Sequence, residues 1–291
     1  MKLSLLYNCE AGDSVPLHLI HDTIERHGHQ LVQVIERAED IERLIDGAPE
    51  LVVAGGGDGT VSAAARLLSG RRIPLAILPL GTANNIAKAV GCQAPIEQLI
   101  AGWEIAPRRA LDLGVAQADS GSSRHFVEGV GAGLIPGGIL EMRRRSTTDE
   151  APTRSRLAEA VWTYSSVLER LKPAVWTVVV DGVRTTGEFL LVEVLNIRSI
   201  GPNLTLSNDA DPFDGLFSIV LAGEEHRSEL ARYLGGRLDE RDRPPALSVQ
   251  QGRRITLEGP TEVHVDDQIL CSRGTVAIEL EAGAVDVLVS A

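Results

Sequence analysis

An apolar stretch that runs into a cluster of glycines limits how this chain can fold. Residues 50–54 read Glu-Leu-Val-Val-Ala, followed by Gly55-Gly56-Gly57-Asp58-Gly59-Thr60 and a helical pattern through Leu68. The apolar stretch predicts a buried strand, and four glycines in five positions let the backbone approach an anion closely. The helix start presents free N–H groups and partial positive charge. These residues therefore predict a strand–loop–helix unit that binds phosphate.

Two polar side chains in this loop can serve a nucleotide. Thr60 can cap the helix or donate to a phosphate, and Asp58 can hold Mg²⁺ or orient the nucleotide. The alternative is a tight turn in which Asp58 is merely solvated, but a turn needs fewer glycines than this. The loop does not match GxGxxG, and the chain contains no Gly-Lys-Ser/Thr. The sequence therefore supports neither a dinucleotide fingerprint nor a P-loop.

A second loop repeats this geometry one strand later. Pro74–Leu78 predicts a strand, and Leu80-Gly81-Thr82-Ala83-Asn84-Asn85 follows it. Gly81 permits close approach, Thr82 can bond a phosphate or ribose, and the two asparagines stand at a helix start. Thr and Asn are also ordinary helix caps, so this loop alone could be purely structural. Paired with the first loop at one sheet edge, it predicts the other half of a phosphate site.

The first hundred residues alternate strand and helix patterns, which predicts a parallel sheet with helices on both faces. The other predicted elements are strands at Leu3–Tyr7 and Leu31–Ile35, a helix from about Ser14 and a short helix at Asp40–Ile45. In such sheets ligands bind beyond the carboxyl ends of the strands, where both glycine loops fall. We therefore expect an α/β nucleotide-binding domain over residues 1–112.

After about Asp112 the chain becomes rich in short β patterns with close turns. Asp181-Gly182, between Val180 and Val183, is a hairpin signal. His125–Val130 and Glu188–Ile197 each read as one strand, and only two helical stretches interrupt the pattern, 151–171 and 227–234. Residues 113–291 are therefore predicted to form an antiparallel β-sandwich domain.

Composition excludes several classes of partner and location. The formal net charge is −12 and only 3% of residues are aromatic, which argues against nucleic-acid binding. The same charge disfavours attraction of the whole surface to anionic membranes. Three isolated cysteines, a start that reads as a strand and the lack of a long apolar run predict a cytoplasmic protein.

At this point the motifs resemble those of the diacylglycerol kinase/sphingosine kinase catalytic superfamily, close to bacterial lipid kinases of the diacylglycerol kinase type. The paired glycine loops are specific to that superfamily. The later motifs that match as an ordered set are Leu111-Asp112-Leu113-Gly114, Gly129-Val130-Gly131-Ala132-Gly133, Asn196 with Gly201-Pro202, Asp211, Asp214-Gly215-Leu216 and Asp266-Asp267-Gln268.

The resemblance implies ATP, Mg²⁺ and a lipid or lipid-like alcohol as acceptor, with Val285–Ser290 returning to the first domain. The nucleotide residues that it implies are Asn8, Gly12, Gly56, Gly57, Asp58, Gly59, Thr60, Gly81, Thr82, Asn84 and Asn85. It also implies a Mg²⁺ site made by Asp211, Asp214 and the carbonyl of Leu216, which are hard oxygen ligands. Without the resemblance, Asp214-Gly215 would read as a plain hairpin turn.

The chain departs from the family pattern at catalytic positions. Ser62 and Ala63 stand where the family often has Asn and Glu, and Asn85 stands for an Asp. Gln268 occupies the place of the proposed general base, and an amide cannot accept the hydroxyl proton. Phosphoryl transfer depends mostly on positioning and charge neutralisation, so the loss need not abolish it. Asp266 and Asp267, on the same predicted turn, are the candidates to replace the base.

Three functions stay open: an ATP-dependent lipid kinase, a kinase of a small soluble molecule such as NAD, and a nucleotide-binding regulator without transferase activity. The apolar residues of 134–142 followed by Arg143–Arg145 could rest on the inner membrane face, with guanidinium groups on phosphate heads. The alternative is an ordinary amphipathic helix with a solvated basic end. Exposed sheet edges are compatible with a homodimer.

Overall fold

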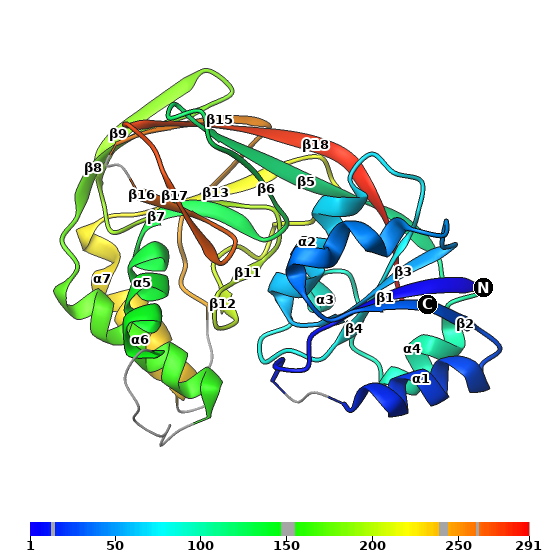
Figure 1. Cartoon of the computed structure of the whole chain (residues 1–291). Coiled ribbons are helices and arrows are strands. Elements are labelled where there is room, and N and C mark those ends of the chain that lie inside the picture. The colour runs from blue at the N-terminus through cyan, green and yellow to red at the C-terminus, as the bar shows by residue number, and fades with distance from the viewer. Residues whose placement is uncertain (13–14, 147–154, 239–243, 260–261, 291) are drawn as a thin grey trace. The chain divides into compact units, whose positions relative to one another are not determined.

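The computed structural model describes residues 1–12, 15–146, 155–238, 244–259 and 262–290 (Figure 1). The chain forms two compact units. The first contains Met1–Leu113, Pro212–Asp214 and Glu281–Ala291, and the second contains Gly114–Asp211 and Gly215–Leu280. Two long strands, β5 (Arg108–Ala118) and β18 (Thr275–Leu288), contribute residues to both units.

The first unit has a parallel sheet in the order β2-β1-β3-β4. Its strands are β1 (Lys2–Tyr7), β2 (Gln30–Ile35), β3 (Leu51–Gly56) and β4 (Leu75–Pro79). All of β3 is buried, as expected of a central strand covered on both faces. The end of β18 extends this sheet, because Val287 pairs in parallel with Leu75. The predicted α/β architecture is confirmed.

Helices connect the parallel strands, because a parallel pair needs a crossover. They are α1 (Leu17–Arg26), the 3₁₀ helix η1 (Ala38–Ile45), α2 (Asp58–Leu68), α3 (Asn85–Ala89) and α4 (Ile96–Gly102). The sequence predicts the first helix from about Ser14, but that residue lies outside the described ones. Helix α1 buries Ile20 and Ile24, one turn apart, against the sheet.

The second unit contains two antiparallel arrangements of strands. One sheet has the order β14-β13-β10-β7-β16-β17. Its strands are β7 (Gly129–Gly133), β10 (Leu191–Leu195), β13 (Phe217–Ala222), β14 (Val249–Gly252), β16 (Glu262–Val265) and β17 (Gln268–Cys271). The facing strands are β5, β6 (Ser123–Phe126), β8 (Ala174–Val180), β9 (Val183–Phe189), β15 (Arg254–Glu258) and β18. The predicted β-sandwich is confirmed.

Side chains from both sheets form the sandwich core. Phe126 and Phe217 stack at 5.4 Å within it, and no atom of either is exposed. Gly114 is required there, because a Cβ at Gly114 would lie 2.0 Å from the Phe126 ring. The Asp181-Gly182 hairpin is confirmed: both residues have positive φ, and Val180 pairs with Val183.

Two of the predicted strands are wrong in extent. His125–Val130 is divided between β6 and β7, because the backbone leaves the sheet at residues 127–128. Glu188–Ile197 is likewise divided between β9, which belongs to one sheet, and β10, which belongs to the other. A continuous β pattern in the sequence does not show where the chain leaves one sheet and enters the other.

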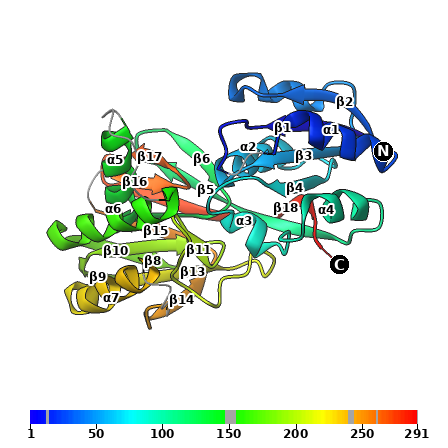
Figure 2. The ribbon, with the colours of Figure 1, turned by 90° about the horizontal axis from the view of Figure 1, so that it is seen from below.

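Helices cover the outer face of the β7–β10 sheet, as Figure 2 shows. They are α5 (Leu134–Ser146), α6 (Arg156–Arg170) and α7 (Arg227–Leu238). Residues 151–154 of the predicted helix 151–171 lie outside the described ones. Short pieces complete the unit: β11 (Ser199–Ile200), β12 (Leu204–Thr205) and the 3₁₀ helix η2 (Glu224–His226). No helix among the described residues is long and apolar enough to cross a membrane.

Candidate functional site

Three loops of the first unit meet at one edge of its parallel sheet. They follow β1, β3 and β4, which are neighbours and run in the same direction. A Cβ at Gly81 would lie 2.3 Å from the Cα of Gly57, and a Cβ at Gly12 would lie 2.9 Å from the backbone N of Thr82. Only glycine fits such contacts. The structure therefore brings Gly12, Gly57 and Gly81 together as a cradle made mostly of backbone.

Asp58 links two of these loops. Its Oδ1 accepts a hydrogen bond of 2.8 Å from the backbone N–H of Ile86, near the start of α3. Asp58 itself is the first residue of α2. The two helix starts, each of which presents backbone N–H groups, are thereby held in a fixed relation. Asp58 therefore has a defined hydrogen-bond partner, so its side chain is not merely solvated.

The second loop is closed by Asn84. Its Oδ1 accepts from the backbone N–H of Gly81 at 2.9 Å, and its Nδ2 donates to the Gly81 carbonyl at 2.7 Å. Asn84 has a φ of +51°, a left-handed conformation that asparagine tolerates better than most residues. Asn85 is buried, whereas Thr82 is exposed at the tip of the loop. Of the predicted polar groups here, Thr82 is the one that solvent reaches most freely.

The first loop packs a threonine over a glycine. A Cβ at Gly56 would lie 2.3 Å from Thr60 Oγ1, so the side chain of Thr60 occupies the space above Gly56. The backbone N–H of Thr60 donates to the Gly57 carbonyl at 3.0 Å, and Gly59 is exposed. In the loop after β1, Asn8 Oδ1 accepts from the Glu10 N–H at 3.0 Å. Asn8 is itself exposed.

A hollow of about 450 Å³ adjoins the second loop. Pro79, Asn84, Lys88 and Pro95 are among the residues that line it. The ammonium of Lys88 donates to the Ala83 carbonyl at 2.7 Å, which places a positive charge beside the loop. The hollow offers room for a small polar ligand, and Asn84 is the residue of the second loop that lines it.

In the second unit, Asp266 and Asp267 form the two-residue turn between β16 and β17. The Asp266 carboxylate is buried, with 3% of the residue exposed, and it accepts from three successive backbone N–H groups. The shortest of these bonds is 2.8 Å, from Glu128, and the others come from Val127 and Gly129. Asp266 has a φ of +51°, which these bonds offset. Asp266 therefore holds the turn in place.

We call Asp266, Asp267 and Gln268, the first residue of β17, the acidic turn. Its other two residues, Asp267 and Gln268, differ in how far solvent reaches them. Gln268 accepts from a guanidinium N–H of Arg124 through its Oε1. Asp267 is exposed, and its carbonyl accepts from Arg143 at 2.9 Å. In the part of the chain that the structure describes, no hydrogen bond to the Asp267 carboxylate is formed. Among the three predicted catalytic residues of this turn, only Asp267 presents a carboxylate to solvent.

The residues predicted to hold Mg²⁺ lie on the approach to β13. Asp214 is exposed, while Asp211 and Leu216 are half-buried. The intervening segment is anchored, because Asp112 donates from its N–H to the Pro212 carbonyl at 2.8 Å and Arg109 lies 3.7 Å from the Phe213 ring centre. Two carboxylates and a carbonyl are the donor set that suits Mg²⁺. Within the described residues, no group of three or more His, Cys, Asp or Glu side chains is arranged to hold a metal.

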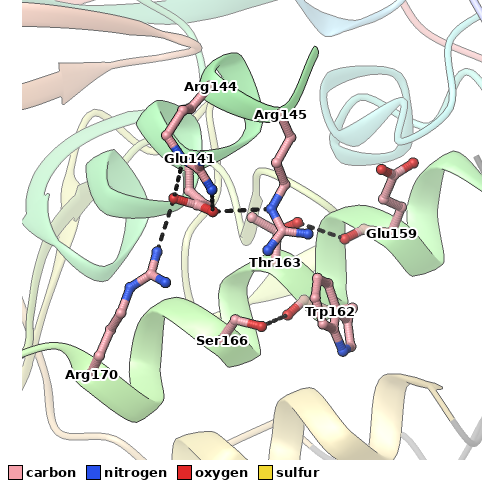
Figure 3. A network of polar contacts seen from close by, with 8 residues as sticks. All are labelled: Glu141, Arg144, Arg145, Glu159, Trp162, Thr163, Ser166 and Arg170. Carbon is pink, nitrogen blue, oxygen red and sulfur yellow. Dashed lines mark hydrogen bonds and ion pairs between the residues drawn. The ribbon is translucent and has the colours of Figure 1, made fainter. Parts of the chain in front are cut away.

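The basic run after the apolar face of α5 takes part in an ion-pair network with α6 (Figure 3). Glu141 accepts from Arg144 at 2.8 Å and Arg145 at 3.1 Å, and Arg170 of α6 lies 2.9 Å away. The hydrogen bond from Arg144 is the main reason why the pKa of Glu141 is lowered to about 2. Arg145 also lies over the Trp162 ring, at 4.4 Å. Glu141 and Arg145 therefore join α5 to α6, whereas Arg144 pairs with Glu141 within α5.

Two functional candidates were not predicted from the sequence. Glu193 and His264 are fully buried and in contact, directly below the acidic turn along β16. A signal was available, because Glu193 interrupts the apolar strand Leu191–Leu195 and His264 lies between two valines of β16. Charged side chains are rarely buried without a partner.

Two protein-family models match this chain. Residues 2–116 match the family model of the diacylglycerol kinase catalytic domain, and residues 138–289 match that of the YegS C-terminal NAD kinase β-sandwich-like domain. A crystal structure of a diacylglycerol kinase from Bacillus anthracis is similar in fold, with a TM-score of 0.74 and 20% identity. That likeness covers 99% of this chain and 97% of the other.

Curated relatives carry the same two names. A diacylglycerol kinase of Mycobacterium tuberculosis is 29% identical over 79% of this chain and 76% of its own length. A Pseudomonas putida protein named "Probable lipid kinase YegS-like" is 30% identical over 78% of this chain and 77% of its own length. The chain therefore belongs to the family of diacylglycerol kinases and YegS-like lipid kinases.

Proposed function

We propose that this protein transfers the γ-phosphate of ATP to a hydroxyl group of a diacylglycerol-like or other lipid alcohol. The observation that carries the proposal is the cradle formed by Gly12, Gly57 and Gly81, where backbones touch at a sheet edge. Two helix starts, at Asp58 and Asn85, lie beside it. Such a place suits a polyphosphate, because it combines backbone donors with partial positive charge.

The nucleotide side of this proposal uses the first unit. Gly56–Thr60 and Gly81–Asn85 hold the phosphates, and Asn8 and Gly12 contribute from the loop after β1. Asp58 keeps the two loops in register through Ile86. Asp211, Asp214 and the Leu216 carbonyl would hold Mg²⁺, which neutralises charge on the phosphates when it is bound.

The acceptor side uses the acidic turn. The acceptor hydroxyl oxygen attacks the γ-phosphorus, the bond from that phosphorus to the bridging oxygen breaks, and ADP leaves. The hydroxyl proton passes to the Asp267 carboxylate, because Gln268 cannot accept it and the Asp266 carboxylate is already bound to three N–H groups. A loose transition state places little demand on the strength of this base.

A peripheral position at the inner membrane face follows from a lipid acceptor. Leu140 and Met142 on α5 are 41% and 38% exposed, and they lie just before the basic run. We expect these two residues to contact lipid. Replacing both with Ser should reduce co-sedimentation with anionic vesicles, and unchanged co-sedimentation would contradict this part of the proposal.

One experiment separates the lipid kinase from its alternatives. The protein is incubated with γ-labelled ATP, Mg²⁺ and, in turn, diacylglycerol, phosphatidylglycerol, ceramide or NAD. Label in the organic phase supports the lipid kinase. Label on NAD in the aqueous phase overturns it in favour of a small-molecule kinase. Binding of ATP without transfer to any acceptor overturns it in favour of a regulator, which Gln268 at the base position would explain.

A further inference from the structure

A buried acid and a buried histidine meet beneath the acidic turn. Glu193 on β10, Gly131 on β7 and His264 on β16 lie side by side on three neighbouring strands. Glu193 Oε2 and His264 Nε2 are 2.8 Å apart, and neither residue is exposed to any extent. A pair this deep carries a large desolvation cost, so its presence calls for a specific reason.

Gly131 makes this contact possible. Residues opposite one another on adjacent strands point to the same face, so a side chain at Gly131 would stand between the acid and the histidine. A Cβ at this position would lie 2.4 Å from the carboxyl carbon of Glu193. The missing side chain lets the carboxylate reach across one strand to the imidazole.

The other nitrogen of His264 contacts the turn. Nδ1 lies 2.9 Å from the backbone carbonyl oxygen of Asp266, and a carbonyl oxygen can only accept. Nδ1 must therefore carry a hydrogen in this arrangement. The contact between Nε2 and Glu193 Oε2 then needs one more proton, supplied by either partner. The pair holds this single proton between two buried atoms.

Burial and mutual contact affect both titrations. Desolvation raises the pKa of Glu193. Desolvation also acts to lower the pKa of His264, but the Glu193 charge and the hydrogen bonds to Glu193 and Asp266 outweigh it, so that pKa is raised. The other titratable groups that interact with the pair are Tyr164 of α6, near Glu193, and Asp266, whose carbonyl contacts His264; Glu128 in turn lies near Tyr164. All of them are buried, so the pair exchanges protons in surroundings without bulk water.

We propose that Glu193 and His264 are positioning residues, whose shared proton keeps Nδ1–H on the Asp266 carbonyl and thereby fixes the peptide that carries Asp267. This inference rests on the proposed function, in which Asp267 receives the hydroxyl proton. The turn has a left-handed residue at Asp266, a conformation that L residues rarely adopt without support. The imidazole supports this conformation through the Asp266 carbonyl, and the N–H groups of residues 127–129 support it through the Asp266 carboxylate.

Loss of the shared proton has a defined consequence. An ionised Glu193 accepts from Nε2, so a neutral His264 then carries its hydrogen on Nε2. Nδ1 is left as a lone pair facing the lone pairs of the Asp266 carbonyl, and the two repel one another. The support for the turn is therefore removed as pH rises through the raised pKa of the pair. Glu193→Gln avoids this, because the amide N–H donates to Nε2 and the hydrogen stays on Nδ1.

Matched double variants test the role of Nδ1. In a Glu193→Gln background, His264→Asn places an amide N–H near the position of Nδ1, whereas His264→Gln reaches only the position of Nε2. Both double variants are assayed with γ-labelled ATP and diacylglycerol in mixed micelles. We expect kcat to be roughly tenfold or more higher in the Asn variant, with similar KM for ATP in both. Equal kcat in two folded variants would overturn the positioning role.

The single variant provides a second measurement if a double variant does not fold. Between about pH 6 and pH 10, wild-type kcat should fall on the alkaline side, while Glu193→Gln should lack that fall. The same alkaline fall in both proteins overturns the inference and leaves the proposed function intact. Wild-type protein that transfers phosphate to no acceptor overturns the proposed function first, and the positioning role with it.

Discussion

The carboxylate of Asp58 and the backbone N–H of Ile86 are joined by a 2.8 Å hydrogen bond between the starts of α2 and α3. The two residues stand 28 positions apart, in helices that follow different strands. Together with the close approach of Gly57 and Gly81, this bond links the two glycine loops. Asp58 of the first glycine loop therefore also helps to hold the second loop in place.

Replacing Asp58 by Ala should raise KM for ATP and lower kcat/KM by about tenfold or more, because a hydrogen bond to a charged group is lost. Asp58→Asn should retain part of the activity, since its amide oxygen can still accept from Ile86. Steady-state kinetics with varied ATP measures both effects. Turnover by Asp58→Ala at the wild-type level would contradict the role of these loops.

Gly81→Ala should weaken nucleotide binding and lower the free energy of unfolding by about 1–3 kcal/mol, because the added Cβ overlaps Gly57. Gly102→Ala is the matched control, since a Cβ there meets no atom within 4 Å. Denaturant unfolding and isothermal titration with ATP are the measurements. Equal behaviour of the two variants would mean that the loops do not touch as described.

Asp267→Asn and Asp266→Asn should fail in different ways. Asp267→Asn is expected to lower kcat by roughly 10²–10⁴-fold with little change in the unfolding midpoint, because it removes the exposed base. Asp266→Asn is expected to destabilise the protein by about 1.5–3 kcal/mol, because it weakens charge-assisted bonds to buried N–H groups. Thermal unfolding and kcat measured on both variants distinguish the roles. Full activity of Asp267→Asn would exclude it as the base.

The Glu193–His264 pair should make stability depend on pH. The folded pair keeps its shared proton, whereas the unfolded chain has an ionised glutamate and loses the histidine proton near pH 6.5. Since both folded-state pKa values are raised, the folded state binds one proton more above about pH 6.5. The free energy of unfolding should then fall by about 1.4 kcal/mol per pH unit until the pair itself deprotonates. Glu193→Gln, compared in denaturant titrations at several pH values, should lack this slope.

Much of the first unit could be predicted from local sequence. Apolar strands ending in glycine loops, with helical patterns between them, identify the parallel sheet and place Gly57 and Gly81 at one edge. The short helix at Asp40–Ile45 was also predictable, although its 3₁₀ form was not. These features depend on residues close to one another in the chain, so a local sequence pattern is enough to predict them.

The roles within the acidic turn could not be predicted in this way. Asp266 and Asp267 are adjacent and chemically identical, yet one is buried on N–H groups of residues 127–129 and the other is exposed. The partners of Asp266 are 137 to 139 positions away, and those of His264 include Glu193 at 71 positions. Such contacts depend on how strands pair, which periodicity alone does not specify.

The missing side chain at Gly131 makes three positions of the chain depend on one another. A homologue that acquired any side chain there would separate the acid from the imidazole and leave two buried polar groups without their partners. We therefore expect that replacement of this glycine is tolerated when Glu193 and His264 are also replaced, by apolar residues that do not need to contact one another. Sequences of this family should accordingly vary at these three positions together.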